Sequence, residues 1–112
     1  MATVVVFALN EEEFLGLTIA TILEAAFEAG GVGLDIIIVN DGSTDGTSGV
    51  IRDLERRYPF IRSIHHARNM GPGTGAKKAV EMAEFPKIIF MPGDNDLSKE
   101  LLVQLFLSKD KA

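Results

Sequence analysis

The stretch IIIVNDGSTDGT, at residues 36–47, decides the fold class. Its first four residues are apolar and β-branched, which disfavours a helix and fits a strand buried on both faces, as in a parallel sheet. Short polar side chains and glycines follow at once, so the chain leaves the sheet in a tight loop. Open α/β sheets bind ligands at the carboxyl ends of their strands, where Asp41 is expected to lie.

An apolar run followed by a polar loop occurs again at other points along the chain. Strands are predicted at residues 3–9, 35–39, 60–66 and 87–91, and the third is less apolar and so nearer an edge. Helical patterns follow each strand, which predicts a three-layer α/β/α fold with a mostly parallel sheet and right-handed crossovers. Asn10 is predicted to cap the first helix with residues 11–13 in its first turn, and Ser98 the last helix.

Each predicted strand is followed by a polar cluster, at residues 10–12, 40–45, 68–75 and 93–96. The carboxyl ends of parallel strands meet at one edge of the sheet, so these clusters are expected to gather there. Their convergence is a stronger indication of a site than any one motif.

Composition excludes several classes of function. The net charge of −5 argues against a broad nucleic-acid surface, and the absence of cysteine excludes thiolate catalysis and cysteine-ligated zinc. The apolar run at residues 4–9 is too short to span a membrane and follows no basic leader segment. We therefore expect a soluble protein of the cytoplasm or of the cytoplasmic face of a membrane.

Several polar residues have a structural interpretation beside a functional one. Glu12 and Glu13 suit a helix dipole, whereas Asn10 and Glu11 lie nearest the strand end and are better candidates for ligand contact. Asp45 is expected to act as a helix cap. Ser43 fits a turn or a ligand site, and for Asp41 we favour ligand contact.

The glycine-rich segment at residues 71–75 fits neither the P-loop pattern nor the dinucleotide fingerprint, because Ala76 and Lys78 stand where those patterns need other residues. With Arg68, Lys77 and Lys78 it would approach a diphosphate or form only a tight turn. Asp94 and Asp96 form a D-x-D triplet that can hold Mg²⁺ or Mn²⁺, and a turn is the alternative. His65 and His66 adjoin in a strand and so point to opposite faces, which favours structural roles.

Four motifs together resemble the family 2 glycosyltransferases of the GT-A fold: ALNEEE (8–13), VNDGSTDGT (39–47), ARNMGPGTGAKKA (67–79) and GDNDLS (93–98). They span almost the whole chain in the family's order, and their style is closest to polyprenyl- or dolichyl-phosphate sugar transferases. The resemblance implies a Rossmann-like domain over residues 1–112 and a glycosyltransferase of the hexosyltransferase type. Its substrates would be a UDP- or GDP-sugar donor and an acceptor such as a polyprenyl phosphate or a glycan.

The same resemblance implies which residues would bind the donor and the metal ion. Asp41 would contact the base, and Asp94 and Asp96 would bridge Mg²⁺ or Mn²⁺ to the diphosphate while the acceptor attacks the anomeric carbon. The nucleotide-binding residues carried over from the motifs are Ala8, Asn10, Glu11, Glu12, Asp41, Ser43, Arg68 and Gly71.

The sequence also departs from the family pattern. Asn40 replaces the first aspartate of a common acidic pair, and Pro92 and Gly93 are interpreted as extra residues before the D-x-D. The chain ends where family members continue into an acceptor half, and no residue is identified as a catalytic base. We therefore expect a donor-binding half, whose apolar last helix would be partly exposed and promote self-association. That expectation concerns Leu101, Leu102, Leu105 and Phe106.

Two alternatives stay open. One is a nucleotide-sugar-binding module without turnover. The other is a receiver-like signalling domain, which would need an aspartate on the third strand, where this chain has histidines. The sequence identifies neither the sugar, the base, the acceptor nor the oligomeric state.

Overall fold

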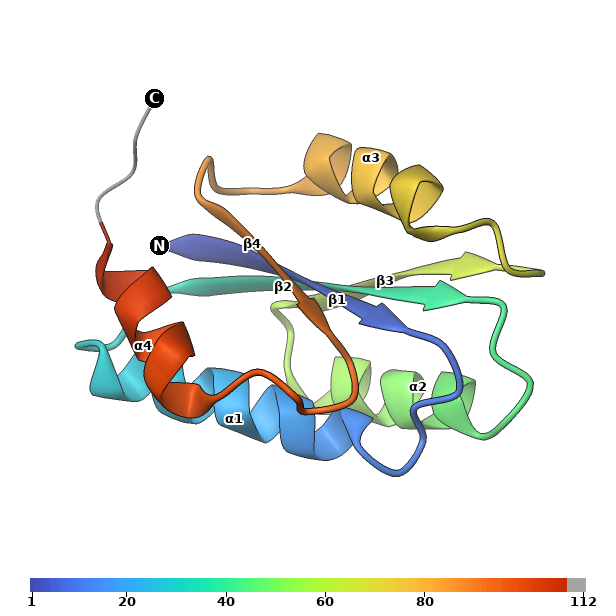
Figure 1. Cartoon of the computed structure of the whole chain (residues 1–112), viewed down its shortest axis with the longest axis horizontal. Helices are drawn as coiled ribbons and strands as arrows, with labels where there is room; N and C mark the ends of the chain where they lie inside the picture. The colour runs from blue at the N-terminus through green and yellow to red at the C-terminus, as the bar shows by residue number, and fades with distance from the viewer. Residues whose placement is uncertain (109–112) are drawn as a thin grey trace.

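The structure, a computed structural model, describes residues 1–108 as four strands that alternate with four helices. All four strands are parallel, in the order β3-β2-β1-β4 (Figure 1). This confirms the predicted α/β class and its parallel sheet; the last four residues of the predicted domain lie outside the described part. The elements are β1 (Ala2–Ala8), α1 (Leu15–Glu28), β2 (Leu34–Asp41), α2 (Thr47–Arg57), β3 (Ile61–His66), α3 (Pro72–Met82), β4 (Ile88–Pro92) and α4 (Lys99–Leu107).

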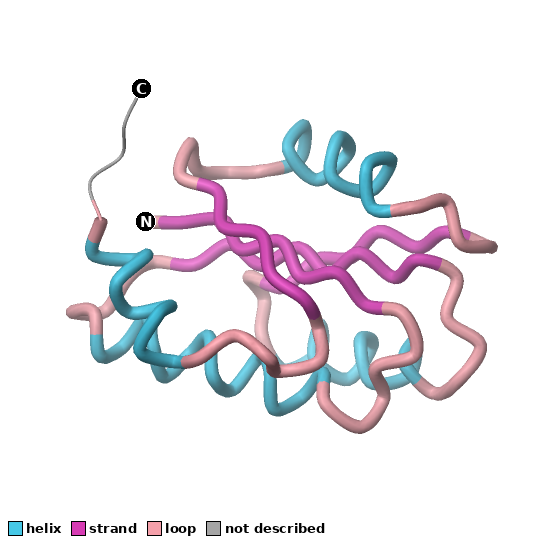
Figure 2. Tube along the Cα trace, in the orientation of Figure 1, coloured by secondary structure: helices cyan, strands magenta, loops and turns pink. Residues whose placement is uncertain are grey.

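The sheet lies between two layers of helices, as expected. Helices α1, α2 and α4 cover one face and α3 covers the other (Figure 2). Successive strand side chains point to opposite faces, so Val4 and Ile36 pack in the core under α1 while Val5 and Ile37 pack toward α3. All four are fully buried, which explains why these strands are continuous apolar runs.

Helix α1 begins later than predicted. Its first residue is Leu15, its N-cap position is Phe14, and no acidic side chain lies in its first turn. The side chain of Asn10, which has a left-handed backbone (φ 54°), points to another loop, so the prediction that it caps this helix is wrong. The cap at Ser98 is confirmed, since its Oγ accepts a hydrogen bond from the Leu101 N–H at 3.1 Å.

Helix α4 packs against α1, and its apolar residues are partly exposed, as expected. Leu102 and Phe106 are buried, whereas Leu101 is 42% exposed. Lys99 adds an ion pair across the helices, with its Nζ 2.8 Å from Glu28 Oε2. Self-association through this helix stays a prediction. Within residues 1–108 no helix combines the length and the apolar character needed to cross a membrane.

A polar network surrounds the buried Asp35 near the amino-terminal ends of the strands. Asp35 is 2% exposed, and its carboxylate accepts hydrogen bonds from Thr3 Oγ1 at 2.9 Å and from Arg62 Nη2 at 2.8 Å. Arg62 is 37% exposed and also donates to the carbonyl of Met82. The network therefore ties β1, β2, β3 and the end of α3 together, far from the polar loops.

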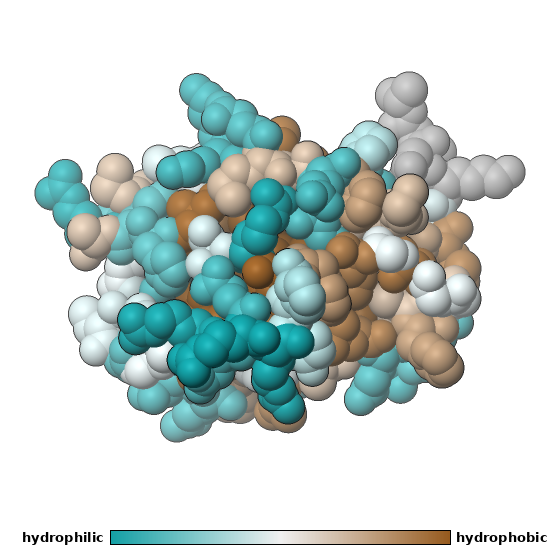
Figure 3. Space-filling model, turned by 180° about the vertical axis from the view of Figure 1, so that it is seen from behind, coloured by the Kyte–Doolittle hydropathy of each residue, from teal (hydrophilic) through white to brown (hydrophobic). Residues whose placement is uncertain are grey.

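The two ends of the sheet differ in character. Seen from behind, hydrophobic residues gather toward the side of the N-terminus and α4 (Figure 1 and Figure 3). A shallow hollow of about 280 Å³ there is lined by Leu23, Phe27 and Phe60, among others, and Phe27 is 81% exposed. The polar loops gather at the opposite end, where all four strands have their carboxyl ends (Figure 1).

Candidate functional site

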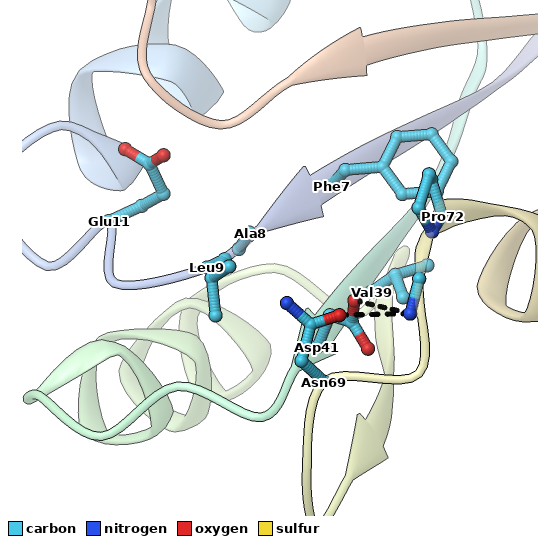
Figure 4. Close-up of a pocket in the computed structure, with 9 residues that line it drawn as sticks. Phe7, Ala8, Leu9, Glu11, Val39, Asp41, Asn69 and Pro72 are labelled. Atoms are coloured by element: carbon cyan, nitrogen blue, oxygen red, sulfur yellow. Dashed lines mark hydrogen bonds between the residues drawn. The ribbon is translucent and has the colours of Figure 1, made fainter.

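A pocket of about 230 Å³ opens at the carboxyl ends of β1 and β2. Part of one wall is the β3–α3 loop, through Asn69 and Gly71, which lies beside Asp41 at the end of β2 (Figure 4). Of the predicted site residues, Ala8, Glu11, Asp41 and Gly71 line the pocket. The other lining residues are Phe7, Leu9, Val39, Asn69 and Pro72, so the cavity is mainly apolar with a few polar groups, as ligand pockets usually are.

Asp41, the last residue of β2, is the centre of the hydrogen bonding around this pocket. Its Oδ1 accepts from the Met70 N–H at 2.8 Å and from His66 Nδ1 at 2.9 Å, and its Oδ2 accepts from the Gly71 N–H at 3.1 Å. The backbone bond from Met70 and then the bond from His66 hold the pKa of Asp41 below its ordinary value. The carboxylate is therefore charged at neutral pH and fastens the β3–α3 loop to the end of β2.

The next residue, Gly42, brings the same loop into direct contact with the strand end. Its φ of +80° is strained for any residue with a Cβ, and a Cβ there would lie 2.5 Å from the carbonyl carbon of Arg68 and the nitrogen of Asn69. Asn69 Oδ1 accepts from the Gly71 N–H at 2.9 Å, beside the Asp41 carboxylate (Figure 4). A side chain at position 42 would displace this wall of the pocket.

Asn10 and Ser43 join two loops and do not line the pocket. Asn10 Oδ1 accepts from the backbone N–H groups of Thr44 at 2.8 Å and Asp45 at 3.3 Å. The Asn10 N–H in turn donates to Ser43 Oγ at 3.0 Å. These bonds clasp the loop after β1 to the loop after β2, which sets the positions of the two strand ends relative to each other.

Asp45 lies one residue before Gly46, the N-cap position of helix α2, and its side chain binds the start of the helix, which agrees with the structural interpretation. Its Oδ1 accepts from the N–H of Thr47, the first residue of the helix, at 2.9 Å, and its Oδ2 lies 3.4 Å from the Glu12 N–H. The hydrogen bond from the Thr47 hydroxyl is the main cause that lowers the pKa of Asp45. Glu12 and Arg68 are exposed and are not among the residues that line the pocket.

Strand β4 reaches one residue further than predicted. Pro92 belongs to the strand, in register with Phe7, so it is not an extra residue before the D-x-D. Gly93 follows directly and is buried; its N–H donates to the Phe7 carbonyl at 2.8 Å, and its carbonyl accepts from Thr18 Oγ1 at 2.8 Å. The triplet therefore leaves the sheet immediately beside β1.

Asp94 and Asp96 are exposed at this sheet edge, and Asp94 lies close enough to Glu11 for their charges to interact. The Asp96 N–H donates to Asp94 Oδ1 at 3.1 Å. Burial is the main cause that raises the pKa of Glu11, and the negative charges of Asp94 and Asp45 raise it further. Among residues 1–108 no three histidine or carboxylate side chains converge closely enough to hold a metal ion by themselves. Two exposed carboxylates can instead hold a cation that takes its other oxygen ligands from a diphosphate and water.

The two histidines at the end of β3 have separate partners, as their opposite directions imply. His65 Nδ1 accepts from Asn40 Nδ2 at 3.1 Å, and Nε2 lies 2.9 Å from Ser63 Oγ. Asn40 Nδ2 also donates to Ser48 Oγ at 2.9 Å, a donation that an aspartate could not make. His65 therefore has the expected structural role, whereas His66 contacts the pocket residue Asp41.

Sequence reasoning missed part of the pocket. The alternation of side chains along each strand could have indicated Phe7 and Val39, which are register partners and therefore lie on the same face of the sheet. Asn69 lies between the predicted site residues Arg68 and Gly71, but nothing in the local sequence indicates where its side chain points. Lys77 and Lys78 are exposed on α3 and line a different hollow, so they are not brought to this pocket.

Comparison with known proteins now identifies the family. The sequence model described as "Glycosyl transferase family 2" matches residues 3–110. The "Uncharacterized glycosyltransferase YibD" of Escherichia coli (strain K12) is 30% identical over 77 residues, which are 69% of this chain and 22% of that protein. The dolichyl-phosphate beta-glucosyltransferase ALG5C of Trichomonas vaginalis is 34% identical over 79 residues, 67% of this chain and 23% of that protein.

Solved structures show the same fold at lower identity. The mannosyltransferase PcManGT from Pyrobaculum calidifontis, in complex with GDP-Man and Mn²⁺, has a TM-score of 0.76 and 19% identity over 97% of this chain and 32% of that one. S. aureus TarS 1-349, in complex with UDP-GlcNAc, has a TM-score of 0.73 and 22% identity over 92% of this chain and 29% of that one.

The chain spans less than a quarter of the length of these two curated relatives. The sequence model nevertheless covers nearly all of it, and the fold agrees with that of the solved structures. The chain therefore belongs to glycosyl transferase family 2.

Proposed function

We propose that this chain binds the sugar donor of a glycosyltransferase, a nucleotide-diphospho-sugar held with a divalent cation. The observation that carries the proposal is the pocket at the carboxyl ends of β1 and β2, which has Asp41 in its wall and the Asp94–Asp96 triplet near Glu11. Ligands of parallel α/β sheets bind at such strand ends. The complexes of PcManGT with GDP-Man and of TarS with UDP-GlcNAc support a donor of this class.

In this proposal the base occupies the mainly apolar pocket and donates a hydrogen bond to Asp41. Ala8, Glu11 and Gly71 border it, as their positions in the pocket support. Asn10 and Ser43 act by holding the strand-end loops in place. Glu12 and Arg68, both exposed, remain proposed nucleotide contacts on the strength of the family motifs.

The carboxylates of the triplet fit a hard divalent cation such as Mg²⁺ or Mn²⁺, since oxygen ligands are those these ions prefer. Asp94 and Asp96 would hold the cation, and the negative charge shared with Glu11 favours its binding. Such a cation, when bound, neutralises the charge that develops on a leaving nucleoside diphosphate.

We further propose that the whole enzyme transfers the sugar to an acceptor such as a lipid phosphate or a glycan, with this chain as its donor-binding domain. A module that binds a nucleotide sugar without turnover is the second candidate, because no described residue is identified as a catalytic base. A receiver domain is not proposed, since β3 ends in His65 and His66 and carries no aspartate. The cytoplasmic location stays a prediction.

Calorimetric titration of the 112-residue chain with UDP and with GDP, each with and without Mn²⁺, tests the proposal. We expect Mn²⁺-dependent binding of at least one of them. A chain carrying both Asp94→Asn and Asp96→Asn should lose the dependence on Mn²⁺, whereas Asp53→Asn, an exposed carboxylate on α2, should keep it. Absence of binding by either nucleotide with Mn²⁺ present would overturn the proposal.

A further inference from the structure

The hydrogen bonds of Asp41 leave its two oxygens in different states. A carboxylate oxygen has two lone pairs that accept hydrogen bonds. Both lone pairs of Oδ1 are occupied, by His66 Nδ1 at 2.9 Å and by the Met70 N–H at 2.8 Å. Among residues 1–108, Oδ2 accepts from the Gly71 N–H alone, at 3.1 Å. One acceptor position therefore remains on the carboxylate for a ligand in the pocket.

His66 can occupy a lone pair of Oδ1 because of the register between β2 and β3. Asp41 and His66 are register partners at the ends of β2 and β3, so their side chains project to the same face of the sheet. Each side chain is only 13% exposed, which limits exchange of this bond for water. Because the carboxylate is an acceptor only, His66 Nδ1 must carry the proton. His66 thereby fixes the rotation of the carboxylate and occupies one of its lone pairs.

Nucleobases differ in how many donors they present to a carboxylate. Uracil presents a single imide N–H between two carbonyl groups. Guanine presents two N–H donors side by side, and these pair best with two free oxygens of one carboxylate. With Oδ1 occupied, Asp41 offers guanine only one of the two acceptor oxygens that this pairing needs.

We propose that His66 is a positioning residue that leaves Asp41 a single acceptor and so selects uracil over guanine in the donor nucleotide. This rests on the proposed function, with Asp41 as the base contact. A second N–H of guanine would enter the site without an acceptor, and a buried donor without a partner weakens binding. The donor class that follows is a UDP-sugar.

Titration of the unmodified chain with UDP, GDP and 3-methyl-UDP, all with Mn²⁺, tests the selection without any substitution. We expect UDP to bind roughly ten- to hundredfold more tightly than GDP, and 3-methyl-UDP, which lacks the imide N–H, to lose a similar factor. Equal or tighter binding of GDP, or unchanged binding of 3-methyl-UDP, overturns the inference and leaves the proposed function standing. Absence of binding by both UDP and GDP overturns the two together.

Variants of His66 test the positioning role. His66→Ala frees a lone pair on Oδ1, so the ratio of the GDP to the UDP dissociation constant should fall toward one. His66→Asn retains a donor near the position of Nδ1 and should preserve the ratio. His65→Ala, on the same strand but with Asn40 and Ser63 as partners, is the matched control and should also preserve it. If His66→Ala weakens both nucleotides by the same factor, His66 has only a structural role and the inference fails.

Discussion

Replacing Asp41 by asparagine changes the group to which the wall of the pocket is fastened. Three N–H donors, from His66, Met70 and Gly71, converge on the carboxylate in the native protein. Asparagine keeps one acceptor oxygen and places an NH₂ group where the other oxygen was. With the NH₂ group at the position of Oδ2, the Gly71 N–H faces another donor and keeps only its bond to Asn69 Oδ1. The acceptor of His66 and Met70 becomes a neutral amide oxygen, so the β3–α3 loop should loosen.

The expected magnitude follows from these bonds. A hydrogen bond to a charged group contributes about 1.5–3 kcal/mol, and the cost is highest where water cannot replace the lost partner. The side chains of Asp41 and His66 are each 13% exposed, so replacement by water is partial. We expect Asp41→Asn to lower the free energy of unfolding by about 2–3 kcal/mol, a large share of the ~5–15 kcal/mol typical of a domain.

Urea unfolding at pH 7, followed by circular dichroism, measures this loss. The midpoint should fall while the slope m stays unchanged, because the surface exposed on unfolding is the same. Asp53→Asn is the matched control: its carboxylate is 72% exposed and pairs with Arg56 on the surface of α2, so the change should stay below about 0.5 kcal/mol. Equal losses in the two variants would refute the view that Asp41 anchors the loop.

Three further predictions concern packing, a buried charge and pH. Gly75→Ala places a Cβ 2.5 Å from Val39 Cγ1, so overpacking of about 1–3 kcal/mol should outweigh the gain in helix propensity and lower the thermal midpoint; an unchanged midpoint would contradict this. Arg62→Met leaves the buried Asp35 carboxylate without its cation and should cost about 2–4 kcal/mol in the urea assay, whereas a loss below about 1 kcal/mol would count against the network. The pKa of Asp41 is lower in the folded protein than in the unfolded chain, whose aspartates titrate at about pH 4, so its contribution to stability is complete above about pH 5 and disappears as the pH falls through the folded-state value. The stability difference between the native chain and Asp41→Asn should therefore shrink as the pH falls from about 5 toward about 2, and a constant difference would contradict the assignment.

Much of the fold could be predicted from the sequence because its signals are local. The apolar runs at residues 4–8 and 36–39 specify strands buried on both faces, and the helical patterns between them require parallel crossovers. The layers, the sheet and the edge position of β3 are confirmed by the structure. The gathering of polar loops at one end follows from the same topology, since parallel strands all end at the same edge.

The tertiary structure alone decided which partner each polar group has. Asn10 looked like the cap of the next helix, yet it binds backbone N–H groups 34 and 35 residues away. Asp41 and His66 are 25 residues apart in the sequence, and they meet because strand register places them side by side. Likewise, the apolar face of α4 is buried because α1 lies against it. Periodicity and loop composition specify how a segment folds, but hydrogen bonds and burial between distant segments depend on register and packing, which exist only in the folded chain.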